Sequence, residues 1–460
     1  MTTTDLQHAH PLGSAATPLP VAAGGPFRRI VVGSLTSGAL AAVVLTLGVF
    51  PGAVEHVTSG IALLAFAAGW ALLAGLTSRW TERPQRWAYV PAAVLATGGL
   101  ALVTLAPGDD ALTAASWGWP PALLVVVLWS QRQARASIPG RTRWLVYPVL
   151  GALALASTGA LANSVALERE DVTDAMPGAL YDVGGHRLHL DCRGTGSPTV
   201  VLENGLSLVS PMWGRITDAT AGTTRVCAYD RAGQGWSDDA PAPQDSAAVT
   251  RDLHALLDAA GESGPFVLAG HSSGGVYALT YAARYPDQVA GLVLLDSASP
   301  HQFTVLPEYA AQYEFLMRLY GVLPTLTRLG IGRLVPALST NDVPGVAGAQ
   351  ATALLNSPRN ARTARDEVST YRRSFEQAKE LTTLGSKPLV VVSATATLDG
   401  TDGWGAAQQQ LAALSRNSDQ RTVSATHVGL LDATDASSAS VRAITDVVDA
   451  VRTGSPLEAS

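Results

Sequence analysis

The chain has 460 residues, of which 47% are hydrophobic and 15% are charged, and its net charge at pH 7 is −6. Soluble globular proteins carry about a quarter charged residues, so a purely soluble protein is not expected. The acidic balance excludes the basic footprint of nucleic-acid binding, and two cysteines are too few for a four-ligand structural zinc site.

Residues 1–28 are rich in Thr, Ala, Pro and Gly and are expected to be a disordered tail. Five stretches without Asp, Glu, Lys or Arg follow: 30–54, 56–78, 87–108, 111–131 and 144–167. A membrane-spanning helix needs about 20 apolar residues, so the sequence predicts a five-helix transmembrane domain over 29–167. Pro120 and Pro121 interrupt the fourth stretch, which membrane helices tolerate.

Nine arginines flank these stretches, and all fall on one side: Arg28, Arg29, Arg79, Arg83, Arg86, Arg132, Arg135, Arg141 and Arg143. The other short loops hold only Glu55, Asp109 and Asp110 as charged residues. The positive-inside rule predicts a cytoplasmic N-terminus and, after five crossings, an extracytoplasmic C-terminal half. The absence of charge inside the stretches argues against a transporter or pump and favours an anchor in the lipid bilayer.

The C-terminal half changes character after a linker at 168–177. Short apolar runs such as PTVVLENGL (198–206) and GPFVLAGHSSGG (264–275) end in small or polar residues and alternate with helical patterns such as 246–261. This alternation predicts βαβ units and a mostly parallel sheet, so the fold class is α/β over residues 178–453, with a short tail at 454–460.

The stretch Gly270-His271-Ser272-Ser273-Gly274 fits G-x-S-x-G between a predicted strand and a predicted helix. In that setting the glycines permit a strained turn that exposes the central serine as a nucleophile. Ser272 is therefore the predicted nucleophile. The backbone N–H of Ser273 can stabilise a developing oxyanion.

A serine hydroxyl needs a base, which this motif usually places last in the chain. His427 follows a short β-like run near the C-terminus and is the predicted base, whereas His301 is interpreted as a loop or pocket residue. The carboxylate that orients the histidine is predicted to be Asp399, after the strand PLVVVS. Asp296 and Asp402 remain alternatives, because each could reach the same edge of the sheet.

With these motifs in place, residues from about 178 to 453 resemble the α/β-hydrolase fold enzymes. YDRAGQGWSD (229–238) resembles the family's D-R-x-G-x-G-x-S loop, and ENGL (203–206) stands where the family has His-Gly after its third strand. The resemblance implies an eight-stranded sheet, a second oxyanion donor at the backbone N–H of Leu206, and a helical cap at about 301–386. Asn204 replaces the common histidine and puts any role of that histidine in doubt.

Two features of this half stay open. The apolar side chains of the cap could line a substrate pocket or pack the cap itself: Tyr309, Tyr313, Phe315, Leu316, Met317 and Tyr320. By the strand order of the resembled fold, Cys192 and Cys227 lie on neighbouring strands, so they could form a disulfide or remain two buried thiols. The spacing of His186, His189 and Cys192 alternates faces of a strand and predicts no metal site.

The sequence thus predicts a membrane-anchored serine hydrolase that cleaves a small-molecule carboxylic ester outside the cytoplasm, without cofactor or metal. Peptidase or amidase activity of the same fold is the alternative within this class. The alternative of another class is a non-catalytic membrane protein with a hydrolase-like binding domain. The sequence identifies neither the substrate nor any protein partner.

Overall fold

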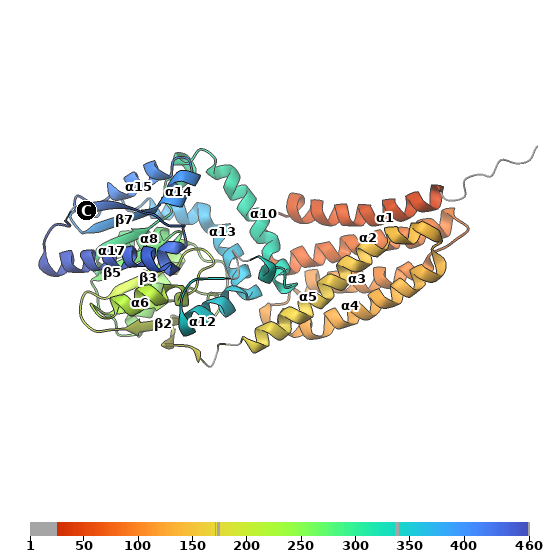
Figure 1. The fold of residues 1–460 in the computed structure, drawn as a ribbon, viewed down its shortest axis with the longest axis horizontal. Coiled ribbons are helices and arrows are strands. Elements are labelled where there is room, and N and C mark those ends of the chain that lie inside the picture. The colour runs from red at the N-terminus through yellow and green to blue at the C-terminus, as the bar shows by residue number, and fades with distance from the viewer. Residues whose placement is uncertain (1–24, 171, 173–174, 336–339, 459–460) are drawn as a thin grey trace, which may run out of the picture.

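The computed structural model describes residues 25–458 except 171, 173–174 and 336–339. The tail expected at 1–28 therefore lies mostly outside the described residues, and helix α1 already begins at Gly25. Figure 1 shows an elongated molecule in which a bundle of long helices adjoins an α/β domain.

Five helices of the bundle are long and apolar enough to cross a membrane. They are α1 (Gly25–Val43) with its continuation η1 (Val44–Val49), α2 (Glu55–Trp80), α3 (Tyr89–Leu105), α4 (Asp109–Ser137) and α5 (Tyr147–Arg169), with the short turns η2 (Arg86–Ala88) and η3 (Gly140–Leu145) between them. Helix α4 continues through Pro120 and Pro121. Helices α1 and α2 pack closely at two glycines, because a Cβ added to Gly38 would lie 2.9 Å from the Cα of Gly69.

The odd number of helices places the start of α1 and the α/β domain at opposite ends of the bundle (Figure 1). Glu55 and Asp109 begin helices α2 and α4 and lie at the end that faces the α/β domain. Arg79 lies in the last turn of α2 and Arg86 is the first residue of η2, so the arginine-bearing loops lie at the far end.

The α/β domain is built on one eight-stranded sheet with the order β1-β2-β4-β3-β5-β6-β7-β8. The strands are β1 (Ala179–Asp182), β2 (Arg187–Arg193), β3 (Val200–Glu203), β4 (Val226–Tyr229), β5 (Phe266–His271), β6 (Val289–Leu295), β7 (Leu389–Ala394) and β8 (Ser418–Val423). The pairs β1–β2 and β2–β4 are antiparallel, and all the other neighbouring strands are parallel. The carboxyl ends of β3, β5, β6 and β7 therefore meet at one edge of the sheet.

Helices cover both faces of this sheet, because successive side chains of a buried strand point to opposite sides. The helices and turns of the two layers are η5 (Ser210–Trp213), α6 (Gly214–Thr220), α7 (Ser246–Ala259), α8 (Gly274–Arg284), η6 (Pro286–Gln288), α14 (Thr395–Gly400), α15 (Trp404–Ala412), α16 (Gly429–Asp432) and α17 (Thr434–Thr453). On β3, Val200 packs with α17 and α6 on one face, whereas Val201 packs with α7 and α8 on the other. The result is a three-layer α/β/α core, and its mostly parallel sheet agrees with the expectation from the alternating sequence pattern.

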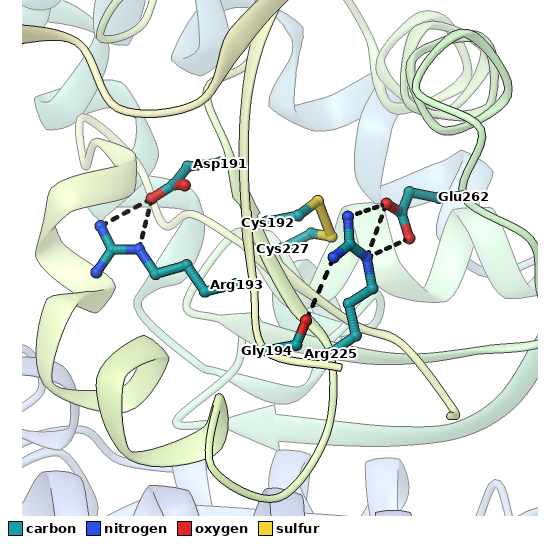
Figure 2. Close-up of a disulfide and its surroundings, with 7 residues drawn as sticks. All are labelled: Asp191, Cys192, Arg193, Gly194, Arg225, Cys227 and Glu262. Carbon is teal, nitrogen blue, oxygen red and sulfur yellow. Dashed lines mark hydrogen bonds and ion pairs between the residues drawn. A yellow bond between two sulfur atoms is a disulfide. The ribbon is translucent and has the colours of Figure 1, made fainter. Parts of the chain in front are cut away.

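Cys192 on β2 and Cys227 on β4 are direct partners in the antiparallel register, and they form a disulfide (Figure 2). The bridge is one of the two alternatives that the sequence left open. Glu262 lies close to both sulfur atoms, but its carboxylate accepts hydrogen bonds from Arg225 at 2.6–2.9 Å. Because the sulfurs are bonded to each other and the carboxylate is paired with Arg225, we interpret this cluster as a structural cross-link between β2 and β4, not as a metal site.

The cap follows β6 and comprises α9 (Gln302–Val305), α10 (Tyr309–Arg328), η7 (Gly332–Leu334), α12 (Gly345–Leu355) and α13 (Pro358–Ala378). Helix α10 runs from the α/β domain to the near end of the bundle (Figure 1). There Arg328 Nε donates to Glu55 at 2.6 Å and Arg328 Nη2 donates to Asp109 at 2.9 Å. The cap is thus attached to both parts of the molecule.

Candidate active site

Ser272 occupies a sharp turn between strand β5 and helix α8. Its φ of 54° lies in the left-handed region, which a non-glycine residue adopts only under constraint. The flanking glycines are required by close backbone approach, because a Cβ on Gly274 would lie 2.3 Å from the carbonyl oxygen of Glu203 and one on Gly270 would lie 2.7 Å from the Cα of Gly275. The turn has the form expected of a nucleophile elbow.

The loop after β3 lies directly against this turn. A Cβ on Gly205 would approach the Cβ of Ser272 to 3.1 Å and the Nδ1 of His271 to 2.9 Å. Within the described part of the chain, no backbone carbonyl accepts a hydrogen bond from the N–H of Leu206 or Ser273. Both N–H groups sit on the segments that meet at Ser272, so they can serve as donors to an oxyanion formed there.

His427 lies in the loop after β8 and is held from two directions. Its Nδ1 is 2.6 Å from Oδ2 of Asp296, and its carbonyl oxygen accepts a hydrogen bond from His271 Nε2 at 2.9 Å. The rings of His271 and His427 are 4.5 Å apart. Since His271 precedes Ser272, these contacts place the His427 loop beside the elbow.

Asp296 follows the last residue of β6 and is fully buried. Its Oδ1 accepts hydrogen bonds from the backbone N–H of Ala394 at 3.2 Å and from Trp404 Nε1 at 2.9 Å, and its Oδ2 accepts one from the Thr397 hydroxyl as well as from His427. Burial alone would raise the pKa of this carboxyl, but the hydrogen bonds outweigh it and hold the pKa below its usual range. Asp296 is therefore an ionised acceptor for the His427 Nδ1–H.

The prediction that Asp399 partners His427 is wrong. Helix α14 begins at Thr395, immediately after β7, and its turn leaves Asp399 exposed while Thr397 faces Asp296. Asp402, the third alternative, is also exposed. Asp296, directly after the end of β6, therefore contacts His427 in the place that was expected for Asp399, five residues beyond the end of β7.

His271 is a further residue of the candidate site that was not predicted from the sequence. Burial, together with the charge of His427, lowers the pKa of its imidazole to about 3. The ring is thus neutral at ordinary pH and donates from Nε2 to the His427 carbonyl. Its position in G-x-S-x-G was visible in the sequence, but nothing in the pattern indicated that it would position the base.

Arg231 lies beneath the site and is also new. It is buried, and it donates from Nη1 to the carbonyl of Asn204 at 2.7 Å and from Nη2 to the carbonyl of Gly205 at 3.2 Å. From the cap, Glu367 on α13 accepts from Arg231 Nη2 at 2.7 Å. One guanidinium therefore links the cap to the loop that carries the Leu206 N–H.

Glu203 shares this buried cluster. Its Oε2 lies 3.6 Å from Arg231 Nη1, and its Oε1 accepts the Tyr229 hydroxyl at 2.7 Å. Burial raises the pKa of Glu203 to about 7 against the opposing effect of Arg231. The loop motifs that contain Glu203 and Arg231 were visible in the sequence, whereas their pairing depends on tertiary contacts.

A second histidine–carboxylate pair, His189 and Asp230, is structural. His189 Nδ1 is 2.8 Å from Asp230, and its Nε2 is 2.7 Å from the carbonyl of Pro177. Burial alone would lower the pKa of His189, but the Asp230 carboxylate outweighs it and raises the pKa. A buried imidazole that donates both of its N–H groups cannot accept a proton from a nucleophile.

The cap aromatics mostly pack the cap itself. Tyr309 and Tyr313 are buried and meet Phe303 edge to face, with ring centroids 4.8 and 5.3 Å apart, and Phe375 of α13 joins the same cluster. Phe315 is 62% exposed and lines no interior surface. Leu316, Met317 and Tyr320 are partly buried beside the core. Of the two interpretations left open, packing therefore holds for Tyr309 and Tyr313.

The family model of the alpha/beta hydrolase fold matches residues 198–434, just over half of the chain. The chain belongs to the α/β-hydrolase family. The fold, the eight-stranded mostly parallel sheet and the preceding apolar helices agree with the expectation from the sequence. This α/β hydrolase aligns with a Nostoc α/β-hydrolase-like protein at a TM-score of 0.50 and 18% identity, covering 58% of this chain and 96% of that one.

Curated relatives match this α/β hydrolase only in part. An uncharacterized protein of Schizosaccharomyces pombe is 30% identical over 190 residues, 35% of each chain. Lipase LipV of Mycobacterium tuberculosis is 41% identical over 112 residues, 24% of this chain and 42% of the lipase. An uncharacterized vacuolar membrane protein of Saccharomyces cerevisiae is 37% identical over 86 residues, 18% of this chain and 13% of that one. The lipase supports a hydrolase, and the membrane protein, with the five apolar helices, indicates membrane association.

Proposed function

We propose that the protein is a membrane-anchored serine hydrolase that cleaves carboxylic esters on the extracytoplasmic side, with Ser272 as nucleophile, His427 as base and Asp296 as the carboxylate that orients it. The observation that carries this proposal is the His427–Asp296 hydrogen bond of 2.6 Å beside the strained elbow at Ser272. The similarity to a lipase favours an ester over an amide. The arginines at the far end of the bundle favour the outward orientation.

In the proposed reaction, Ser272 Oγ attacks the ester carbonyl carbon while His427 Nε2 takes the hydroxyl proton. The N–H groups of Leu206 and Ser273 stabilise the resulting oxyanion. The tetrahedral species collapses, His427 returns the proton to the leaving alcohol, and an acyl-Ser272 ester remains. Water then attacks this ester with His427 again as base, which releases the carboxylic acid and restores Ser272.

Turnover of p-nitrophenyl esters by the purified full-length protein in detergent tests this proposal. We expect hydrolysis of at least one chain length from acetate to palmitate, and we expect Ser272→Ala to lower kcat by ~10⁴-fold or more, because no other group replaces the nucleophile. Ser369→Ala, which changes an exposed serine of the cap, is the matched control and should keep wild-type turnover. Equal activity of Ser272→Ala and wild type would remove Ser272 from the mechanism.

A further inference from the structure

Exposed large apolar side chains of the described α/β domain and its cap are confined to the cap. After α5 they fall only within residues 315–346 of the described chain: Phe315, Leu319, Ile331, Leu334, Val335 and Val346. Leu334 is 78% exposed. A monomeric soluble surface rarely gathers such residues in one segment, so the cap surface is expected to contact an apolar partner.

The segment at 329–335, here called the cap tip, lies along membrane helix α5. A Cβ on Gly159 would lie 2.4 Å from the carbonyl oxygen of Leu329, so the two backbones touch. Just before the tip, Asn163 Nδ2 donates to the carbonyl of Thr327 at 3.1 Å. Within the tip, Arg333 pairs with Glu170 at 2.8 Å. Along the chain, the cap tip therefore runs beside α5 from Gly159 towards the end of the helix near Glu170.

This contact fixes how far the cap tip descends. Gly159 stands eight positions before Leu167, the last residue of the charge-free stretch 144–167. At 1.5 Å per residue this is about 12 Å along the helix axis. Leu329 directly follows Arg328, which pairs with Glu55 and Asp109 at the first residues of α2 and α4. The cap tip therefore lies at the end of the bundle, where the apolar part of these helices begins, and α5 continues about 12 Å beyond it towards the α/β domain.

The position of the cap is held by polar contacts at the bundle end. Arg328 joins Glu55 and Asp109, the first residues of α2 and α4, and Thr325 lies 2.8 Å from Ser59 by their hydroxyl oxygens. The guanidinium of Arg328 has an exposed side-chain fraction of 14%, so these ion pairs are largely shielded from water. Helix α10 thus connects the α/β domain to the bundle, and these contacts hold its end in place (Figure 1).

We infer that the cap tip sits in the headgroup–acyl boundary of the adjoining leaflet, and that the hydrolase takes esters of long acyl chains from this leaflet. The partner is a lipid surface, because exposed apolar side chains continue from the cap onto the bundle: Leu155 of α5 is 75% exposed and stands one helical turn before Gly159, which touches Leu329. The statement about the substrate rests on the proposed hydrolase function, whereas the placement of the cap tip does not.

The placement is tested in proteoliposomes with the full-length protein, labelled with the fluorophore NBD at Leu334→Cys. The described cysteines are both in the disulfide, so one label is added. Asp449→Cys is the control, since this exposed residue belongs to α17, which lies away from the bundle (Figure 1). We expect nitroxide-labelled lipids to quench the Leu334 label and aqueous iodide to quench the Asp449 label. Iodide quenching equal at both sites, with no lipid quenching, would overturn the inference.

The substrate class is tested by Leu334→Asp, which places a charge at the cap tip. We expect roughly tenfold slower hydrolysis of a long-chain p-nitrophenyl ester presented in vesicles, and unchanged hydrolysis of a soluble acetate ester. Equal loss on both esters, or none on either, would contradict a lipid-borne substrate. Absence of any ester turnover by the wild type would instead contradict the proposed function and leave the fluorescence result to decide the placement.

Discussion

Replacing Asp296 by Asn is expected to lower kcat by about 10⁴-fold, measured as ester hydrolysis by the full-length protein. The Asn amide can still accept from the Ala394 N–H and Trp404 through one oxygen, so the fold should survive. It cannot replace the carboxylate that accepts the His427 Nδ1–H and stabilises the imidazolium. The proton would then occupy the wrong nitrogen of His427, and Ser272 would lose its base.

Asp399→Asn is the matched control for this prediction. Asp399 is exposed on α14, and its replacement should leave kcat within about twofold of wild type, as is usual for exposed sites. Thermal unfolding in detergent should show that both variants fold. If Asp399→Asn abolished turnover and Asp296→Asn did not, the assignment of the carboxylate would be reversed.

Replacing Arg231 by Met is expected to destabilise the protein by about 3–5 kcal/mol, because it leaves Glu203 and Glu367 buried without their cation. The loss should grow with pH. The pKa of Glu203 in the fold is about 7, above its usual value of 4.5, and removal of Arg231 removes a cause that lowers it. A carboxyl with a raised pKa stabilises the fold most below about pH 4.5, and this contribution is lost as pH rises towards and beyond 7.

Thermal unfolding of Arg231→Met and of the wild type at pH 5 and pH 8 measures how the loss of stability changes with pH. Arg416→Met, at an exposed arginine, is the control and should change stability little at either pH. The double variant Arg231→Met/Glu367→Leu should recover part of the loss, since one buried carboxylate is removed with the cation. A difference between Arg231→Met and wild type that shrinks from pH 5 to pH 8 would contradict the buried cluster as described.

The backbone turn at Ser272 could be predicted from the sequence because it depends on local pattern alone. It requires only a strand, two glycines and a helix, all of which the sequence indicates and the structure contains. The choice of carboxylate depended on the turn after β7, and the local pattern did not show that α14 would begin at Thr395. A useful signal was nonetheless present, because Asp296 directly follows a buried strand next to the strand of Ser272.

The architecture was predictable for a different reason. The absence of charged residues predicts the long apolar helices, and the alternation of strand and helix patterns predicts the parallel sheet. Each element contributes to one of these two signals, so the prediction does not depend on any single residue. The attachment of the cap to the bundle was not predictable. Arg328, Glu55 and Asp109 are far apart in the sequence, and each alone is a charged residue near a helix end.

Labelling of intact cells with a charged, membrane-impermeant fluorophosphonate tests whether Ser272 is a nucleophile outside the cytoplasm. We expect a covalent adduct on Ser272 without permeabilisation and none on Ser272→Ala. An adduct that forms only after the cells are lysed would contradict the orientation. An adduct that persists in Ser272→Ala would contradict the nucleophile.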